Sequence, residues 1–519
     1  MEHKIKNIIA LSVSLVVSVS LFAQEGDGLN TPAAYEQMKI RNQWHNTTNS
    51  AGLFLDRPKN YTELNVGYEL YTGSFHRPQE GENGNNLNVG AEGSVVVNKI
   101  YMWGKFDYTR STIKDANFNS SIIDPFRGMP YILADVNKSE WRNQSYDFSF
   151  KVASPKQWNK LSLGIEGGYV AKSGAKQRDI RAENYYYTAT IKPGIAYSIN
   201  DQHHVGVNFE YYSLKEESKN SIVNAADYKQ YYELFGLGSA YSQLGSGKTT
   251  NYEGNNVGGG LQYNYQGIVN LLLSGTYNLK VEDVSFSFTD PLDQGTTKDK
   301  IWNTKLQLYK DVNNVTHFIS ADYTNRKIDG IEYITQYDTQ NGYVTLGKFV
   351  KSNYKTQIVV LDYDLSINNN QSHEYLWKFG AGVKYSDKKD VYLLPYSEKN
   401  AQNIAYQLRA KRNFILSNNA LMKRFLLAAD YSYSRNISGK YDYNGSYPTY
   451  PVVTLLEAVD AAYLRSDFYS IGAAATYSQK IKETLLPSVY LKAEFRYTKA
   501  IASQFSNRHN LLVSFGFNF

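Results

Sequence analysis

The chain has 519 residues, no cysteine and a formal net charge of +6. The lack of cysteine excludes disulfides, zinc–thiolate sites and thiol chemistry, and the modest charge gives no support to a nucleic-acid partner. The mean hydropathy of −0.49, with no long apolar run beyond residue 23, excludes a helical membrane protein. A transmembrane β-barrel remains compatible with these values, because its strands alternate apolar and polar residues.

The first 23 residues have the features of an export signal. Lys4 and Lys6 precede an apolar run at 8–22, and Ala23 precedes an acidic, glycine-rich stretch. The apolar run is too short to cross a bilayer comfortably. With no cysteine near the cut, a lipid anchor on the mature chain is excluded. We therefore expect residues 1–23 to be a signal peptide and the exported chain to begin near Gln24.

Residues 24–60 differ from the rest of the chain. Thr31-Pro32 is typical of a helix cap and first helical position, so a helix is expected over 32–40. Farther on, Asn49-Ser-Ala-Gly-Leu53 resembles the Asn-Pro-Ala-Gly-Leu of fatty-acid-transporter-like barrels, with Ser50 in place of proline. In that family the segment plugs the lumen. The resemblance implies that residues 24–60 form a periplasmic or plug segment.

From residue 61 to 519 the sequence alternates apolar and polar residues, as strands with one buried face do. About eighteen strands can be counted, and sixteen remain possible because assignments within 268–327 could merge. Their approximate ranges are 61–74, 86–97, 100–110, 144–154, 160–171, 185–199, 203–214, 255–265, 268–281, 299–310, 315–327, 354–367, 374–386, 403–415, 421–434, 468–480, 487–498 and 509–519.

Two further features favour an outer-membrane barrel. Counted from the first strand, every even-numbered link is short, and the odd-numbered links are nearly all longer, which predicts short periplasmic turns and long extracellular loops. The chain also carries 46 Tyr, 23 Phe and 6 Trp, and aromatic rings suit membrane–water interfaces. The prediction is an all-β, transmembrane antiparallel barrel in a bacterial outer membrane, with both termini periplasmic and a short amino-terminal plug-like segment.

The last strand ends the chain on an aromatic residue. Leu511, Val513, Phe515, Phe517 and Phe519 share one face, and small or polar residues share the other. This ending resembles the terminal strand of bacterial outer-membrane barrels, which the barrel-assembly machinery reads. We therefore assign Phe519 as the assembly signal.

The lumen-facing residues are charged and unevenly distributed. The first seven strands carry mainly acids, Glu63, Glu69, Glu92, Asp107, Asp147, Glu166 and Glu210. The last six carry mainly bases, Lys378, Lys384, Arg409, Lys411, Arg424, Lys492 and Arg496. An acidic wall facing a basic wall would select zwitterionic or charged solutes. The alternative is an interior filled with mutually neutralising charges.

Three loops are unusually aromatic or apolar, at 124–135, 222–241 and 441–463. Such loops fold inward as a constriction, pack together as a lid, or contact a partner or glycan. No catalytic, cofactor-binding or metal site is predicted. The adjacent His203 and His204, for example, point to opposite faces of a strand and cannot chelate one ion together.

Over its full length the chain resembles the porin-like, single-chain outer-membrane barrels of Bacteroidota, which are associated with TonB-dependent uptake. The favoured function is a channel for small polar solutes, gated by the loops or by residues 25–60. The alternative is a non-conducting accessory barrel of a larger uptake or secretion complex, which binds partners through its aromatic loops. Expected partners are outer-membrane lipid and lipopolysaccharide and the assembly machinery, with a TonB-dependent transporter or a surface lipoprotein as further candidates.

Overall fold

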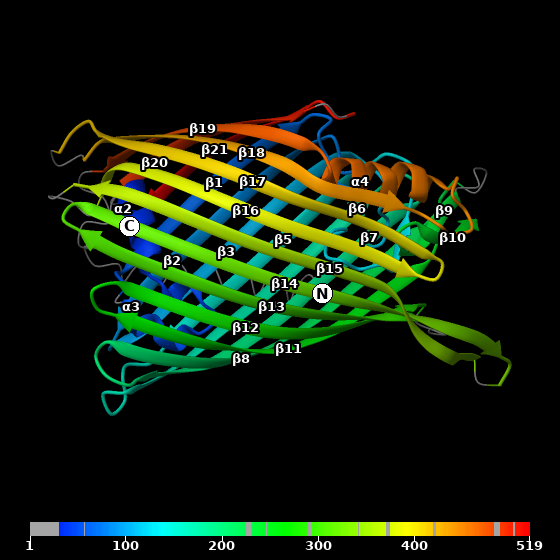
Figure 1. Cartoon of the computed structure of the whole chain (residues 1–519), viewed down its shortest axis with the longest axis horizontal. Coiled ribbons are helices and arrows are strands. Elements are labelled where there is room, and N and C mark those ends of the chain that lie inside the picture. The colour runs from blue at the N-terminus through cyan, green and yellow to red at the C-terminus, as the bar shows by residue number, and fades with distance from the viewer. Residues whose placement is uncertain are drawn as a thin grey trace.

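The barrel closes completely. The computed structural model describes residues 31–519 except 57, 225–229, 245–246, 288–291, 341, 370–373, 419–421, 482–487 and 502–503. The signal peptide predicted for 1–23 lies outside the described residues. Within the described part, eighteen antiparallel strands form one sheet, each paired to the next along the chain and the last paired to the first. Figure 1 shows them running obliquely around the wall. The predicted fold class and the count of eighteen are confirmed.

The elements have the following bounds. The barrel strands are β1 (Tyr61–Thr72), β2 (Asn83–Val97), β3 (Ile100–Ala116), β5 (Ser139–Ala153), β6 (Leu161–Lys176), β7 (Arg181–Ser198), β8 (His203–Ser221), β11 (Thr249–Gln266), β12 (Asn270–Phe286), β13 (Leu292–Val312), β14 (Val315–Asp338), β15 (Gly342–Asn368), β16 (Tyr375–Leu393), β17 (Tyr396–Ile415), β18 (Arg424–Asp442), β19 (Asp467–Lys480), β20 (Ser488–Ile501) and β21 (Asn507–Asn518). A small sheet contains β4 (Ile132–Ala134), β9 (Gln230–Gly236) and β10 (Ser239–Leu244). The helices are α2 (Pro32–Arg41), η1 (Trp44–Asn46), η2 (Ser50–Gly52), α3 (Leu53–Asp56), η3 (Val452–Glu457) and α4 (Ala458–Leu464). Among the described residues, none of these helices is long and apolar enough to cross a bilayer.

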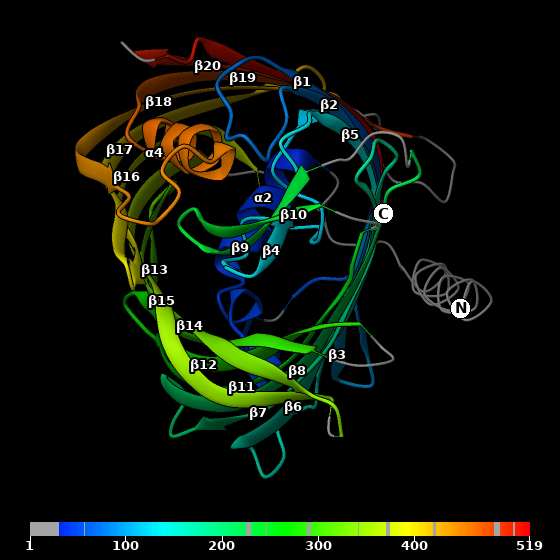
Figure 2. The same cartoon turned by 90° about the vertical axis from the view of Figure 1, so that its right-hand side faces the viewer.

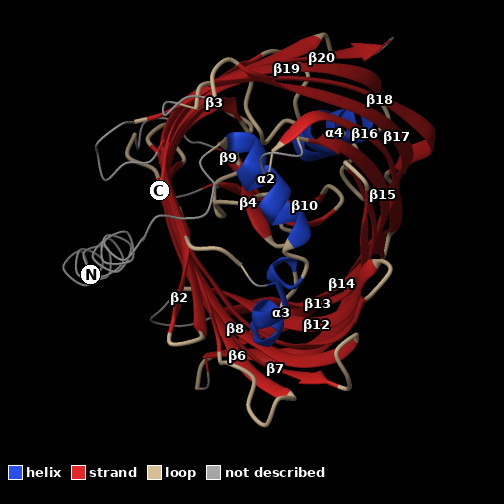
Figure 3. Cartoon of the chain, turned by 90° about the vertical axis from the view of Figure 1, so that its left-hand side faces the viewer, coloured by secondary structure: helices blue, strands red, loops and turns tan. Residues whose placement is uncertain are grey.

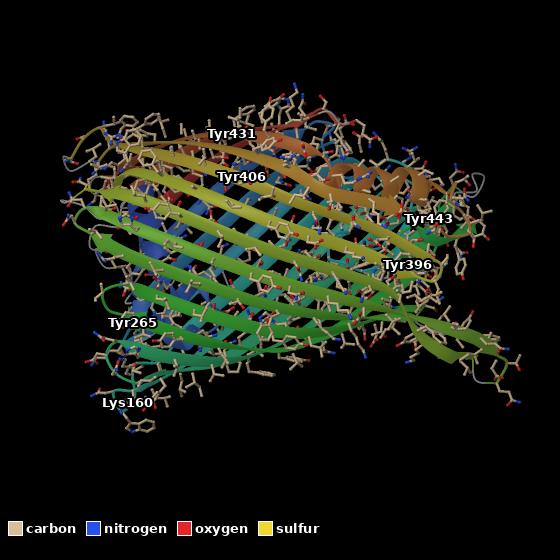
Figure 4. The ribbon with its side chains drawn as sticks, in the orientation of Figure 1. Lys160, Tyr265, Tyr396, Tyr406, Tyr431 and Tyr443 are labelled. Carbon is tan, nitrogen blue, oxygen red and sulfur yellow. The ribbon has the colours of Figure 1, made fainter. Side chains whose placement is uncertain are left out.

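The alternation of faces is the one expected of strands in a membrane. Along β7, Tyr185, Tyr187, Ile191, Ile195 and Tyr197 are exposed large side chains of one parity. Figure 4 shows side chains projecting outward around the wall, among them Tyr406 and Tyr431. An exposed band of apolar and aromatic side chains would be unfavourable in water and is stabilised by lipid. A closed barrel with such a band spans a bacterial outer membrane.

The expectation of long odd-numbered links is wrong for several of them. The turns between β6 and β7, β12 and β13, β14 and β15, and β16 and β17 span at most five residues, because the strands continue through the predicted loops. Lys389, for instance, pairs with Asn400. The reason is physical. Outside the membrane no strand face contacts lipid, so apolar residues are not needed at every second position. Segments such as 387–393 of β16 therefore lose the alternation of apolar and polar residues by which a strand is recognised in a sequence.

At the opposite end the turns are short, as predicted. Between β2 and β3, Asn98 and Lys99 both have positive φ, at 50° and 66°. Two successive residues of positive φ form the two-residue turn whose twist matches antiparallel strands. The end of the barrel with these short turns also holds α2 and the C-terminus (Figure 1).

Candidate functional site

The N-terminal segment, residues 31–56, lies inside the barrel. Figure 3 shows α2 and α3 lying across the opening at the end with the short turns. Thr31 caps α2, with its side chain accepting from the Ala34 backbone nitrogen, and Pro32 occupies the first turn, as the sequence predicts. Trp44 is fully buried, and its Nε1 donates to Asn264 Oδ1 on β11 at 3.2 Å. The segment therefore fills part of the lumen.

The Asn49–Leu53 motif anchors this segment to the wall. Asn49 Nδ2 donates to the backbone oxygens of Ile195 and Val207 and to Gln262 Oε1, at 3.0, 3.2 and 2.8 Å. Ala51 lies so close to β6 that a Cβ built on Gly164 would come within 2.3 Å of its backbone nitrogen. The motif and a glycine in the wall thus fit each other.

Helix α2 carries two opposite charges that reach different parts of the wall. Glu36 Oε1 lies 2.9 Å from both Lys378 Nζ and Lys411 Nζ. Lys39 Nζ lies 3.2 Å from Glu92 Oε2 and 3.7 Å from Glu63 Oε2. The carboxylate therefore faces the strands predicted as basic, and the ammonium faces the strands predicted as acidic.

The Glu36 carboxyl is strongly acidic in this position. Burial alone would raise its pKa, but the ammonium groups of Lys378 and Lys411 outweigh burial and lower the pKa to about 2. A carboxyl whose pKa is lowered by folding stabilises the folded state at pH values above its ordinary pKa of 4.5. This stabilisation is lost as the pH falls toward 2. At neutral pH the Glu36 carboxyl is therefore ionised and can pair with Lys378 and Lys411.

An open gap separates α2 from one side of the wall. Its volume is about 660 Å³, and it is bounded by α2 and by the inner face of β18 to β21. The wall side carries the small residues Ala428, Ala474 and Ser514, together with Asp430 and Glu494. Small side chains leave this space unfilled, so the N-terminal segment does not close the lumen here.

The predicted glutamates of the first strands find partners in the structure. Glu63 and Glu92 contact Lys39, as described, and Glu69 accepts hydrogen bonds from Asn86 and Asn510. Lys192 Nζ lies 3.0 Å from Glu166 and 3.8 Å from Glu210. Lys151 bridges Glu166 to the backbone oxygens of His45 and Thr47. The acids of the first strands are thus partly neutralised, partly by the N-terminal segment itself.

The predicted basic residues are also largely paired. Arg409 lies 2.7 Å from Asp362 and 3.2 Å from Asp364, Lys492 lies 2.7 Å from Glu494, and Arg496 contacts Asp430 at 2.8 Å. Arg424 is buried against Glu374 at 2.8 Å, and Lys384 is exposed.

Two acids of β15, Asp362 and Asp364, were missed by sequence reasoning. They lie on β15, which belongs neither to the first seven nor to the last six strands whose charges were compared. Their proximity to Arg409 follows from the register of β15, β16 and β17. The interior thus combines a local neutralising network with the two charge clusters that hold α2.

The other end of the barrel is covered by what we call the lid, made of the described parts of loops 117–138, 222–248 and 443–466. Figure 2 shows β4, β9, β10 and α4 lying in the barrel mouth. These loops include the three segments singled out in the sequence, and of the alternatives considered they pack together and fold inward. They share one apolar core that includes Phe118, Ile122, Met129, Tyr131, Tyr232, Leu234, Phe235, Val452, Val453 and Leu456.

The lid also enters the lumen and contacts the wall. Arg127 lies 3.1 Å from Glu216 and 2.8 Å from Glu282, and Tyr252 donates to the Tyr131 backbone oxygen at 3.0 Å. Beneath Arg127 lies a second cavity of about 460 Å³, whose lining includes Lys192 and Glu210. The lumen is therefore narrowed from both ends.

A buried ionic cluster fastens the lid to the wall. Lys399 Nζ on β17 lies 2.6 Å from Glu457 and 2.9 Å from Asp460, and Arg77 Nη2 donates to Asp460 at 3.0 Å. Burial would raise the pKa of Asp460, but Lys399 and Arg77 hold it well below its usual range. Asp460 therefore stays ionised and needs both cations.

We expect Lys399→Met to loosen the lid. The substitution leaves Glu457 and Asp460 buried without their shared cation, a change that typically costs about 3–5 kcal/mol. Faster limited proteolysis within 443–466 would report it. Lys440→Met is the matched control, because Lys440 also pairs with carboxylates but is half-exposed. Equal protease resistance of Lys399→Met and the native protein would contradict the role given to Lys399.

Among the described residues, no group of three or more His, Asp or Glu side chains could hold a metal ion. What the described residues define is a transmembrane β-barrel with a charged lumen that is narrowed by an N-terminal segment and a lid.

The chain belongs to the family of unknown function DUF6850, which matches residues 50–519. No match is found among curated proteins. Among solved structures, the chain is similar to BauA, the ferric preacinetobactin receptor of Acinetobacter baumannii, with 8% identity and a TM-score of 0.40 over 89% of this chain and 80% of that one. It is also similar to OpdK of Pseudomonas aeruginosa, with 10% identity and a TM-score of 0.34 over 89% and 99%. A third similar structure is the outer-membrane transporter YddB of Escherichia coli, with 7% identity and a TM-score of 0.39 over 88% and 81%.

Proposed function

We propose that the protein is a non-enzymatic outer-membrane channel that passes small polar solutes along the gap between α2 and the inner face of β18 to β21. The observation that carries this proposal is the gap itself, about 660 Å³ in volume and lined by both charged and small side chains. A polar lining compensates a solute for part of the water that it loses. The N-terminal segment acts as a plug that restricts this path, and the lid acts as a second restriction.

Filling the gap should reduce the current. We expect Ala428→Trp, whose side chain borders the gap, to lower single-channel conductance in planar bilayers by roughly twofold or more. The matched control is Ala429→Trp, because Ala429 is exposed on the opposite face of β18 and does not line the gap. Equal conductance of the two variants would refute this route. An absence of current and solute flux, even after removal of residues 25–48, would refute the channel.

One feature favours the alternative, an accessory barrel that binds partners. Among the described residues, β14 has no pairing to β13 beyond Glu332, and β15 has none to β16 before Ser352. The two strands nevertheless stay paired to each other as far as Asp338 and Gly342. This hairpin projects past the rim (Figure 1) and exposes large side chains, Ile334, Tyr337, Tyr343, Leu346 and Phe349. A two-stranded ribbon is only marginally stable alone in water, so a partner would stabilise it.

The two functions differ in a measurable way. An accessory barrel stays silent in bilayers after removal of residues 25–48 and copurifies with a stoichiometric partner under mild detergent. A TonB-dependent transporter and a surface lipoprotein are the proposed partner classes. A channel conducts as a purified protein. Its current does not depend on the projecting hairpin.

A further inference from the structure

Helix α2 occupies the lumen as a small charged ligand would. Three donors surround the Glu36 carboxylate: Lys378 Nζ and Lys411 Nζ at 2.9 Å from Oε1, and the Tyr375 hydroxyl at 2.7 Å from Oε2. All three lie on the adjacent strands β16 and β17. We call Tyr375, Lys378 and Lys411 the carboxylate cluster. Two ammonium groups and a hydroxyl around one carboxylate form a site in which charge-assisted hydrogen bonds are strong.

The Lys39 ammonium has a complementary site. Glu92 and Glu63 lie 3.2 and 3.7 Å from its Nζ, and the Tyr61 ring centroid lies 6.0 Å away. The Tyr61 hydroxyl and Trp103 Nε1 both donate to Glu92 and hold its carboxylate in place. We call Tyr61, Glu63 and Glu92 the ammonium cluster. Two carboxylates beside an aromatic ring favour a primary ammonium group.

Both clusters can be reached from the open gap. Glu63, Lys378 and Lys411 line it, as do Glu36 and Lys39 themselves. A solute in the gap therefore meets the wall groups beside α2. Withdrawal of α2 would leave Asp364, 3.4 Å from Lys378, as a counter-charge of the carboxylate cluster and would take Lys39 away from Glu63 and Glu92. Such groups are costly when unpaired, so they favour a solute that carries both charges.

We infer that the carboxylate and ammonium clusters form a selective site for small zwitterions, specifically short peptides with free termini, and that α2 is a tethered competitor for this site. The inference rests on the proposed channel function and names its substrate class. Glu36 and Lys39 lie three positions apart on α2 and reach strands on different parts of the wall, so the site fits a solute that carries opposite charges at its two ends. A neutral sugar engages neither cluster, and a simple ion engages only one.

The test compares two solutes of nearly equal size in proteoliposomes that contain the full mature chain. One is zwitterionic trialanine, and the other is trialanine with an acetylated amino terminus and an amidated carboxyl terminus. We expect trialanine to enter several-fold faster. In Lys378→Met/Lys411→Met and in Glu63→Gln/Glu92→Gln, the ratio of the two rates should fall toward one. In Lys305→Met, which removes a lysine that pairs with Asp322 at 3.6 Å on β13 and β14, away from both clusters, the ratio should be retained.

The possible failures are distinguishable. If both peptides enter the native protein at equal rates, the channel stands and the zwitterion site is refuted. If a preference exists but survives both double substitutions, the site is likewise refuted. If neither peptide enters, even after removal of residues 25–48, the channel function fails and the inference fails with it.

Discussion

Replacing Phe519 with serine should prevent most of the protein from reaching the outer membrane. The backbone nitrogen of Phe519 donates to the Thr62 oxygen at 2.8 Å, where ten successive pairs between β21 and β1, Glu63–Asn518 to Thr72–His509, close the barrel. An unclosed barrel leaves a row of unpaired backbone groups in lipid, which is strongly unfavourable. We propose that the terminal aromatic residue is the assembly signal, and we therefore expect the folded, heat-modifiable form in outer-membrane fractions to fall several-fold.

The control is Phe515→Ser. Phe515 lies on the same outward face of β21, and its substitution removes the same ring without changing the terminal residue. Loss of a lipid-facing ring costs only about 1.5–3 kcal/mol, which a barrel of this size should tolerate. Normal membrane levels of Phe519→Ser would show that this residue is not an assembly signal. An equal loss in both variants would assign the effect to hydrophobicity alone.

Displacing the N-terminal segment should raise single-channel conductance several-fold. Removal of residues 25–48 deletes α2 and Trp44, and with them the ion pairs of Glu36 and Lys39. Because the lumen then contains a wider polar path, more ions should pass for the same voltage. Conductance in planar bilayers measures this directly. An unchanged current in a folded variant would show that the segment does not restrict passage.

A single substitution offers a milder version of the same experiment. Gly164→Val places a side chain where the backbone of Ala51 lies, and so should unseat η2. Gly168→Val on the same face of β6 is the control, because a Cβ there meets its nearest neighbour at an ordinary 3.5 Å. Conductance should rise in the first variant and remain native in the second. A rise in both would point to a general disturbance of the wall.

The sequence predicted the membrane-spanning part well. Each of the eighteen strands overlaps its predicted range, because lipid on one face and water on the other enforce alternation. The tightest agreement is at the short-turn end, where β3 starts at Ile100 and β14 starts at Val315, both as predicted. At the other end β15 begins at Gly342, twelve residues before the predicted start at 354, because both of its faces there are polar or exposed.

The candidate site was predictable in its parts and not in its arrangement. Alternation identified Lys378, Lys411, Glu63 and Glu92 as inward-facing, and these are the residues that hold α2. Nothing in the sequence connects Lys378 and Lys411 to Glu36, because these contacts join residues more than three hundred positions apart. Nothing in the sequence identifies Lys39 as the partner of Glu63 and Glu92 either. The arrangement of the lid could not be predicted either. The aromatic residues of its loops are evident in the sequence, but the core that they share forms only because the closed wall brings the loops together.

The composition of the lid core has a consequence for the order in which the molecule is built. Its loop residues come from positions 118–134, 232–240 and 452–456, which the intervening strands bring together only when most of the wall is in place. Bringing such distant parts of a chain together carries an entropic cost that must be met before any contact compensates it. We therefore expect the mouth of the barrel to stay uncovered until late in folding. A complete lid therefore requires a barrel whose strands have paired with their neighbours.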